Sequence, residues 1–399
     1  MEGVEKSILQ AWWFERQGLA KPDSKLTSAQ VLERSGWARS VGGANPYLTL
    51  FSRAGISREQ TDKDVANLDI HELPSARGCT YVVPRSEFAL ALKVGQGFSD
   101  ESEIALAKKH LGVTDAEVDR LITRVLEVLE GEPKDPRLLK DLLGDAVRSL
   151  GDAGKKRGMS STLPLAFGRL QSSGQIRRVP LDGRLDRQRY AYARWDPSPL
   201  AGSSMTKDEA LSELARKYFR WIGPASVGHF QWFSGLGVKA AKDVVASIGV
   251  VPLEEGSDLL LFPDDRDSLL SFKRPAEPNY ALVAGIDSLF LHRRNVVDHV
   301  EPQDLARQAI GEKGFMEIGG LADLTNNAIV DRGRLVGLWE FDPGQGTIAW
   351  TSFVPRTKDL EAAVANMEAY SRDQLGDVRS FSLDSPESRA PKIAALRGS

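Results

Sequence analysis

Apolar and polar residues in the first hundred positions alternate in a pattern that predicts four helices followed by two strands. Residues 4–18 place their apolar residues on one face of a helix, and the two last runs have the composition of short strands. Helices followed by a two-stranded ribbon are the order of a winged-helix unit. The helices are predicted at residues 4–18, 28–35, 46–53 and 58–68, and the strands at 69–73 and 79–83.

The same order of elements recurs twice more along the chain. In the second occurrence, Asp182 and Gly183 separate two strand-like runs, which is a strong signal for a β-hairpin. In the third, Thr206 caps a long amphipathic helix. The second unit is predicted to hold helices at 98–131 (two), 137–150 and 161–174, a flexible basic loop at 151–159, and strands at 175–180 and 189–195; the third follows a linker at 197–199 and ends in a hairpin at 250–262.

After residue 262 the pattern changes to short strands separated by Gly, Pro and Asn turns. Such spacing favours a small β-barrel or a curled sheet. A helix is predicted at 358–373, and the Ser-, Pro- and Arg-rich end of the chain is expected to be disordered. The strands are predicted at 281–283, 327–330, 334–340 and 347–353.

These elements predict an α+β protein of three tandem winged-helix units followed by a small C-terminal β-barrel. A chain of 399 residues with 41% hydrophobic and 27% charged residues is long enough for several folded domains. The expected units are 1–96, 97–199 (with a basic wing), 200–257, a barrel-like domain with a C-terminal helix at 258–380, and a tail at 381–399.

Composition narrows the chemistry that the chain can perform. The one cysteine, Cys79, excludes a disulfide framework and a cluster of zinc-binding thiolates, and the closest histidines, His292 and His299, do not have a zinc spacing. We therefore expect neither a metal nor a cofactor. No apolar run is long enough to cross a membrane and no secretory signal precedes residue 20, so a cytoplasmic protein without membrane contact is expected.

Charge is distributed unevenly. The formal net charge is −3, yet residues 148–194 hold eleven basic and three acidic residues, a local excess of +8. Such a face suits the phosphates of double-stranded DNA, whereas the plain alternative is a solvated basic surface. In a winged helix the third helix enters the major groove and the wing contacts the backbone. The predicted DNA-binding residues are Ser161, Thr162, Arg169, Gln171, Arg177, Arg178, Arg184, Arg187 and Arg189.

Two other clusters have a weaker claim to function. The third unit presents Lys239 and Lys242 before an acidic hairpin, which favours a packing role. The acidic run Asp264, Asp265 and Asp267 is consistent with a metal or acid–base site, but also with an ordinary turn.

Several segments between about Gln10 and Thr357 carry a family resemblance. They are SGWARSVGGANPYLTLFSR, ARGCTYVVPRSEF, GMSSTLPLAFGRLQSSGQIRRVPLDGRLDRQRYAY, RKYFRWIGPASVGHFQWFSGLGVKAAKDVV and the stretch from LLLFPDDRDSLL to RGRLVGLWEF. Together they resemble the winged-helix DNA glycosylase family that repairs alkylated and crosslinked DNA in bacteria. The resemblance implies three winged helices and a β-barrel arranged around duplex DNA, and hydrolysis of the N-glycosidic bond of a damaged base.

The family's Gln-x-Gln motif, which positions the attacking water, is not matched here. Its glutamine positions fall on Ala38 and Ser40, and the histidine of the family's Arg-Gly-Thr-x-His run is replaced by Tyr81. Arg39, Ser40 and Asn45 are the polar side chains left as catalytic candidates in this segment.

Three functions are therefore open, and whether the protein is an enzyme is left undecided. The first is a DNA-binding, repair-related protein with altered or absent catalysis, favoured by the basic segment and the missing glutamines. The second is an active DNA glycosylase that hydrolyses the N-glycosidic bond of alkylated purines. The third is a protein-interaction scaffold that uses winged helices without DNA, and the net negative charge favours it slightly.

Overall fold

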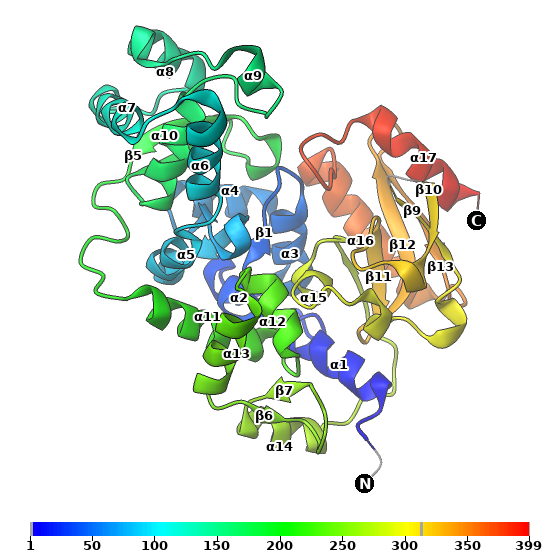
Figure 1. The fold of residues 1–399 in the computed structure, drawn as a ribbon. Helices are drawn as coiled ribbons and strands as arrows, with labels where there is room; N and C mark the ends of the chain where they lie inside the picture. The colour runs from blue at the N-terminus through cyan, green and yellow to red at the C-terminus, as the bar shows by residue number, and fades with distance from the viewer. Residues whose placement is uncertain (1–2, 312–313, 399) are drawn as a thin grey trace.

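The structure, a computed structural model, describes residues 3–311 and 314–398. Its first two thirds are mainly helical, and its last third holds a four-stranded sheet flanked by helices (Figure 1). Among the described residues, no helix combines the length and apolar character needed to cross a membrane.

The first part of the chain surrounds a small antiparallel sheet in the strand order β1-β3-β2. Helix α2 begins and ends where the sequence indicates: a Thr27–Gln30 capping box begins it and Gly36 ends it. The short strand β1 was not predicted, because two residues carry no alternation pattern. The elements are α1 (Lys6–Arg16), α2 (Ser28–Ser35), β1 (Ala38–Arg39), α3 (Asn45–Ala54), α4 (Arg58–Ala66), β2 (Ile70–Pro74), β3 (Thr80–Pro84) and α5 (Phe88–Gly95).

The next hundred residues form a helical cluster with a two-stranded hairpin. The helix predicted at 137–150 ends at Leu143, because Gly144 takes a positive φ of 50°. The loop predicted at 151–159 contains a short helix instead. The elements are α6 (Ser99–Leu111), α7 (Asp115–Val128), α8 (Pro136–Leu143), α9 (Gly151–Lys155), α10 (Leu163–Ser172), β4 (Ile176–Pro180) and β5 (Tyr190–Arg194).

A third helical group follows, and its hairpin is reduced to two-residue strands. Thr206 begins the first helix through a capping box with Glu209. The elements are α11 (Lys207–Ile222), α12 (Val227–Ser234), α13 (Val238–Ser247), β6 (Val251–Pro252), β7 (Leu260–Leu261) and α14 (Pro263–Ser271).

The C-terminal sheet is open, so the predicted β-barrel is wrong. Its antiparallel strands have the order β13-β12-β11-β8, and in the described chain the outer strands β13 and β8 do not pair with each other. A barrel requires that closure. The elements are β8 (Tyr280–Val283), α15 (Ser288–Leu291), β9 (Gln308–Gly311), β10 (Gly314–Glu317), β11 (Asn327–Asp331), β12 (Arg334–Asp342), β13 (Thr347–Ser352), α16 (Lys358–Tyr370) and α17 (Pro386–Arg397).

The chain end that was expected to be disordered forms the helix α17. Ser385 caps it, and it packs on β12 and β13 (Figure 1). Ile393 and Leu396 are both only 7% exposed. Two apolar residues three positions apart are enough to bury one face of a short helix, although the segment as a whole is polar.

The apolar cores divide the molecule in a way that positions a cleft. The largest core joins the first group, the third group and the C-terminal part, and the second joins mainly the first group and the C-terminal part. Two smaller cores consist only of residues between Ile104 and Tyr192. The helical cluster from α6 to β5 is therefore stabilised mainly by its own packing, and its boundary with the first sheet is where a cleft opens.

Candidate nucleic-acid interface

Helix α10 is the candidate recognition helix, and its apolar face fixes its orientation. Pro164 lies in its first turn, where a missing N–H costs nothing. Leu165, Phe167 and Leu170 are buried in the local cores. The opposite side of the helix is thereby turned toward solvent and the cleft.

Two predicted contacts at the start of this helix lie in different environments. Ser161 is half-buried and lines the cleft. Thr162 is fully buried, and its hydroxyl accepts a hydrogen bond from the backbone N–H of Arg148 at 3.2 Å. Its prediction as a DNA-facing residue is therefore wrong, because its hydroxyl fastens the preceding loop.

The two predicted contacts further along α10 are half-buried. Arg169 forms a 3.1 Å ion pair with Asp119 of α7. Gln171 lines the cleft, and its amide donates to the Phe167 carbonyl at 3.1 Å. Both polar groups have protein partners that nucleic acid would have to replace or share.

The β4–β5 hairpin and its connecting loop (residues 176–194), which we call the wing, carry arginines that divide into two groups. Arg178 pairs in register with Tyr192, and both line the cleft. The guanidinium of Arg178 lies 5.2 Å from the Tyr190 ring centroid, and Arg177 is half-buried. Burial lowers the pKa of Arg177.

The tip of the wing carries the more accessible cations. Arg187 and Arg189 are exposed, and Arg187 lies 3.4 Å from the carboxylate of Asp182. Gly183 turns the chain with a φ of 75°. Both guanidinium groups are exposed, so they can contact a polyanion at little cost in desolvation.

Arg184 attaches the wing to the C-terminal part of the chain and is not on the exposed surface of the wing. It is 9% exposed, forms an ion pair with Asp186, and donates to the Leu375 carbonyl at 3.0 Å. Burial lowers the pKa of Arg184, but its hydrogen bond and charge interaction with Asp186 raise it overall. The prediction of Arg184 as a DNA contact is therefore wrong.

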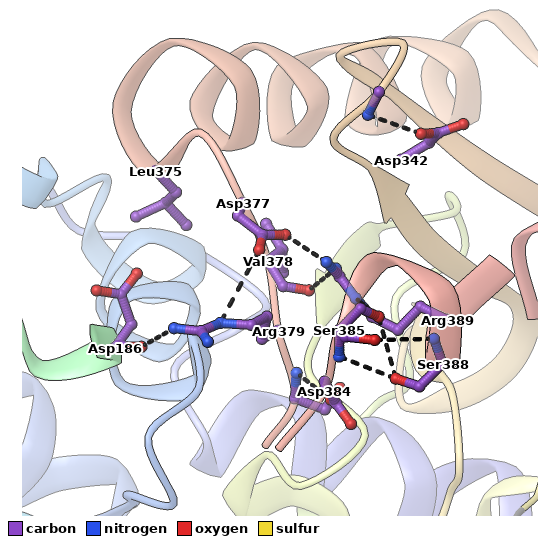
Figure 2. Close-up of polar contacts among 12 residues, drawn as sticks. Asp186, Asp342, Leu375, Asp377, Val378, Arg379, Asp384, Ser385, Ser388 and Arg389 are labelled. Carbon is purple, nitrogen blue, oxygen red and sulfur yellow. Dashed lines mark hydrogen bonds and ion pairs between the residues drawn. The ribbon is translucent and has the colours of Figure 1, made fainter. Parts of the chain in front are cut away.

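The segment that contains Asp377 and Arg379, after α16, contacts the wing at Asp186, as Figure 2 shows. Arg379 donates to the Asp186 carbonyl at 2.7 Å and lies 3.9 Å from Asp377. Asp377 also pairs at 2.7 Å with Arg389 of α17, which donates to the Val378 carbonyl at 3.1 Å. The wing, this segment and α17 are thus connected through one polar network.

Ion pairs reduce the basic excess that the sequence suggests. Six of the eleven basic residues between positions 148 and 194 pair with a carboxylate in the described chain. Three of those carboxylates, Glu117, Asp119 and Glu130, lie earlier in the chain, outside the basic segment. The effective positive face is therefore smaller than the segment charge alone indicates.

The positions expected for the family's glutamines lie on and just after strand β1. Ala38 and Ser40 are 2% and 3% exposed. The Ser40 hydroxyl donates to Oε1 of Glu72 on β2. Neither position by itself offers a side chain that can hold water in a cleft.

The other polar candidates nearby serve the local structure. Arg39 donates to the Thr80 carbonyl at 3.0 Å and lies over the Tyr81 ring at 5.4 Å. Asn45 is buried and donates to the Arg39 carbonyl at 2.8 Å. Tyr81, at the position of the family's histidine, is buried, and burial raises the pKa of its phenol.

Glu72 is the ionisable residue at this place that sequence reasoning missed. It is 5% exposed, and its second carboxylate oxygen, Oε2, has no hydrogen-bond donor in the described structure. The signal was present in the sequence: an acidic residue inside the buried strand Ile70–Pro74 is unusual and requires a partner or a role.

Glu72 lines a cleft of about 510 Å³ between the first sheet and the α10–wing face. Its lining is mixed, with Thr80 and Arg178 as polar groups and the stacked rings of Phe167 and Tyr192, whose centroids lie 4.2 Å apart. A cleft of this size, partly apolar with a few polar groups, suits a small organic group such as a nucleobase.

The remaining clusters form no comparable site. Asp264 and Asp265 both pair with Arg220 at 2.7 Å, which gives them a structural role. Lys239 and Lys242 are exposed on α13. In the two described ranges, no group of three or more His, Cys, Asp or Glu residues is placed to hold a metal ion.

Comparison with known proteins places this interface in a family context. The sequence model of the family described as DNA glycosylase AlkZ-like matches residues 32–370. The chain belongs to the AlkZ-like DNA glycosylase family. The residues of this chain that match the AlkZ-like family include the first sheet, the cleft and the wing.

A solved structure of an AlkZ protein has the same fold. The chain superimposes on the Streptomyces sahachiroi DNA glycosylase AlkZ with a TM-score of 0.70 at 18% sequence identity, covering 95% of this chain and 99% of that one. No curated protein sequence matches. Membership of the AlkZ-like family supports a repair-related role in DNA binding, and the fold agrees with it.

Proposed function

We propose that the protein binds duplex DNA, including duplexes with a damaged base, across the face formed by α10, the β4–β5 wing and the adjoining cleft. The observation that carries this proposal is the arrangement of the wing. Arg178 and Tyr192 line the cleft at its middle, and Arg187 and Arg189 are exposed at its tip. A duplex on the tip would bring its bases beside a cleft of nucleobase size.

The wing geometry also indicates how much of the binding is electrostatic. Exposed arginines contact phosphates without a large desolvation penalty, and each neutralised phosphate adds to the salt dependence of binding. The proposed contacts at the wing are Arg187 and Arg189 in its loop and Arg177 and Arg178 on β4. Ser161, Arg169 and Gln171 remain proposed contacts on the α10 side.

The test is fluorescence anisotropy with a labelled duplex over a range of salt concentrations. The double variant Arg187→Ala, Arg189→Ala should raise Kd on the order of tenfold at low salt and reduce the slope of log Kd against log salt by about 2. Lys239→Ala with Lys242→Ala removes two exposed charges from α13 and is the matched control.

The results separate DNA binding from a scaffold role. Unchanged affinity in the wing variant, or an equal loss in both double variants, would contradict the proposed face. Absence of any DNA affinity at low salt, together with a stable protein partner on co-purification, would support the protein-interaction scaffold instead.

A further inference from the structure

Glu72 lies in the same row of the first sheet as the position expected for the family's first glutamine. Val82 of the central strand pairs with Ala38 on one side and with Glu72 on the other. Residues paired across strands point to the same face, and so do residues two apart on one strand. Ala38, Ser40 and Glu72 therefore share one face of the sheet.

The Ser40–Glu72 hydrogen bond brings a carboxylate to the place where the second glutamine is expected. The serine side chain is too short to reach far from its strand, but its hydroxyl donates to Oε1 of Glu72. That bond uses one oxygen and fixes the carboxylate, while Oε2 has no donor. The longer side chain of Glu72 on β2 therefore lies beside the short side chain that follows β1.

The burial of Glu72 and its position at the cleft are those of a ligand-binding carboxylate. The side chain is 95% buried and still lines the 510 Å³ cleft. An unsatisfied buried carboxylate oxygen costs folding free energy, so its persistence at a cleft points to water or a ligand as its partner.

Arg178 and Tyr190, both from the wing, lie close to Glu72. Burial alone lowers the pKa of Arg178, but the Glu72 carboxylate and the adjacent tyrosines raise it overall, which reports attraction between the two charges. The Tyr190 phenol is also close: burial, and then the charge of Glu72, raises its pKa. A side-chain hydrogen bond with Glu72 contributes to this shift, and the Tyr190 hydroxyl also donates to the Leu185 carbonyl at 3.4 Å.

We propose that Glu72 is a catalytic residue, with Ser40 as its positioning residue, for hydrolysis of the N-glycosidic bond of a cationic alkylated purine nucleotide extruded into the cleft. This inference rests on the proposed DNA binding. The stacked pair Phe167 and Tyr192 supplies an apolar wall for the base, and Glu72 lies on the wall formed by the first sheet.

The step is balanced with water as the only co-reactant. A water molecule donates a hydrogen bond to Oε2 of Glu72, its oxygen bonds to C1′, and its proton passes to the carboxylate. The C1′–N9 bond breaks, and its electron pair enters the purine, where it neutralises the positive charge that alkylation created. The base leaves neutral and needs no general acid, and the carboxylate also stabilises the positive charge that develops on the sugar.

The experiment uses the full chain and a duplex with one 7-methylguanine, incubated and then treated with alkali to cleave abasic sites. The wild-type protein should release the base, and Glu72→Gln should lower single-turnover excision by about 10² or more while Kd for the duplex changes less than about twofold. Glu59→Gln removes an exposed carboxylate from the same unit and is the matched control.

Ser40→Ala provides a second variant that keeps the carboxylate. It should lower the excision rate about tenfold with an unchanged KM and shift the acid limb of the pH–rate profile, because Oε1 loses its donor. A purely structural role for Ser40 would lower stability without moving that limb. Circular dichroism of each variant establishes that it is folded.

Each outcome decides the proposal. Duplex binding without base release by the wild-type protein would overturn catalysis by Glu72 and leave the proposed DNA binding intact. No binding would overturn both. Base release that survives in folded Glu72→Gln would assign the chemistry to another residue.

Discussion

Arg53 and Asp287 form a two-armed ion pair that joins the first helical group to the C-terminal domain. Nη1 lies 2.9 Å from Oδ2 and Nη2 lies 2.8 Å from Oδ1, and both side chains are 1% exposed. Asp287 also caps α15 through the Leu289 N–H, and Gln17, the residue that follows α1, accepts a hydrogen bond from Arg53 at 3.1 Å. One guanidinium therefore ties α3, α1 and α15 together.

Arg53→Ala should lower the free energy of unfolding by about 3–5 kcal/mol, because it leaves the Asp287 carboxylate buried without its counter-charge. Burial raises the pKa of Asp287, and Arg53 reverses this so that the pKa is low overall. Urea unfolding measures the loss. Arg124→Ala, which removes an exposed arginine paired with Glu127, should cost less than about 1 kcal/mol. Equal costs in the two variants would contradict the role of the buried pair.

Gly36→Ala should be more destabilising than alanine at an unobstructed glycine. Gly36 has a φ of 95°, and a Cβ there would lie 2.3 Å from Cε1 of the buried His292 ring. We expect a loss of about 2 kcal/mol or more, since steric overlap adds to backbone strain. Gly112→Ala, with a φ of 61° and nothing within 4 Å, tests strain alone and should cost about 1 kcal/mol. Thermal unfolding of both variants gives the comparison, and a smaller effect at Gly36 would refute it.

Glu340 should make stability fall as the pH rises toward neutrality. It is buried on β12, where Asn326 donates to it at 2.8 Å, and burial raises its pKa from 4.5 to about 7. The protonated form is favoured in the folded state, so its contribution is complete below about pH 4.5 and is lost as the pH rises through about 7.

Glu340→Gln removes this dependence and should stabilise the protein at pH 8 by up to about 3 kcal/mol relative to wild type, with little difference near pH 4.5. Urea unfolding at the two pH values measures the change. Glu361→Gln, at an exposed position of α16, controls for the loss of one negative charge. A stability difference that does not vary with pH would show that Glu340 does not titrate in this range.

The sequence predicts most of the local elements because caps and periodicity are local. Thr27, Thr206 and the Asp182–Gly183 turn all act where their residue types indicate. The sequence could not show that the C-terminal sheet stays open, because closure depends on pairing between strands far apart in the chain. The helix α17 was hidden by its polar composition and forms because β12 and β13 cover its two apolar residues.

The candidate site was only partly predictable for the same reason. The basic wing is visible in the sequence, but the burial of Thr162 and Arg184 depends on contacts with Arg148 and Leu375. Glu72 is 32 residues from Ser40, and only the strand order β1-β3-β2 brings them together. A one-dimensional motif therefore shows the missing glutamines but not the carboxylate that reaches the same place.

The attachment of the wing to the C-terminal segment determines when, during translation, the wing can take its final position. Arg184 and Asp186 are held by Leu375 and Arg379, which lie 191 and 193 positions later. Chains emerge from the ribosome N-terminus first, and early domains fold as they appear. A nascent chain that already contains the whole basic segment still lacks the contacts that orient its wing, so the nucleic-acid face matures only when translation is nearly complete.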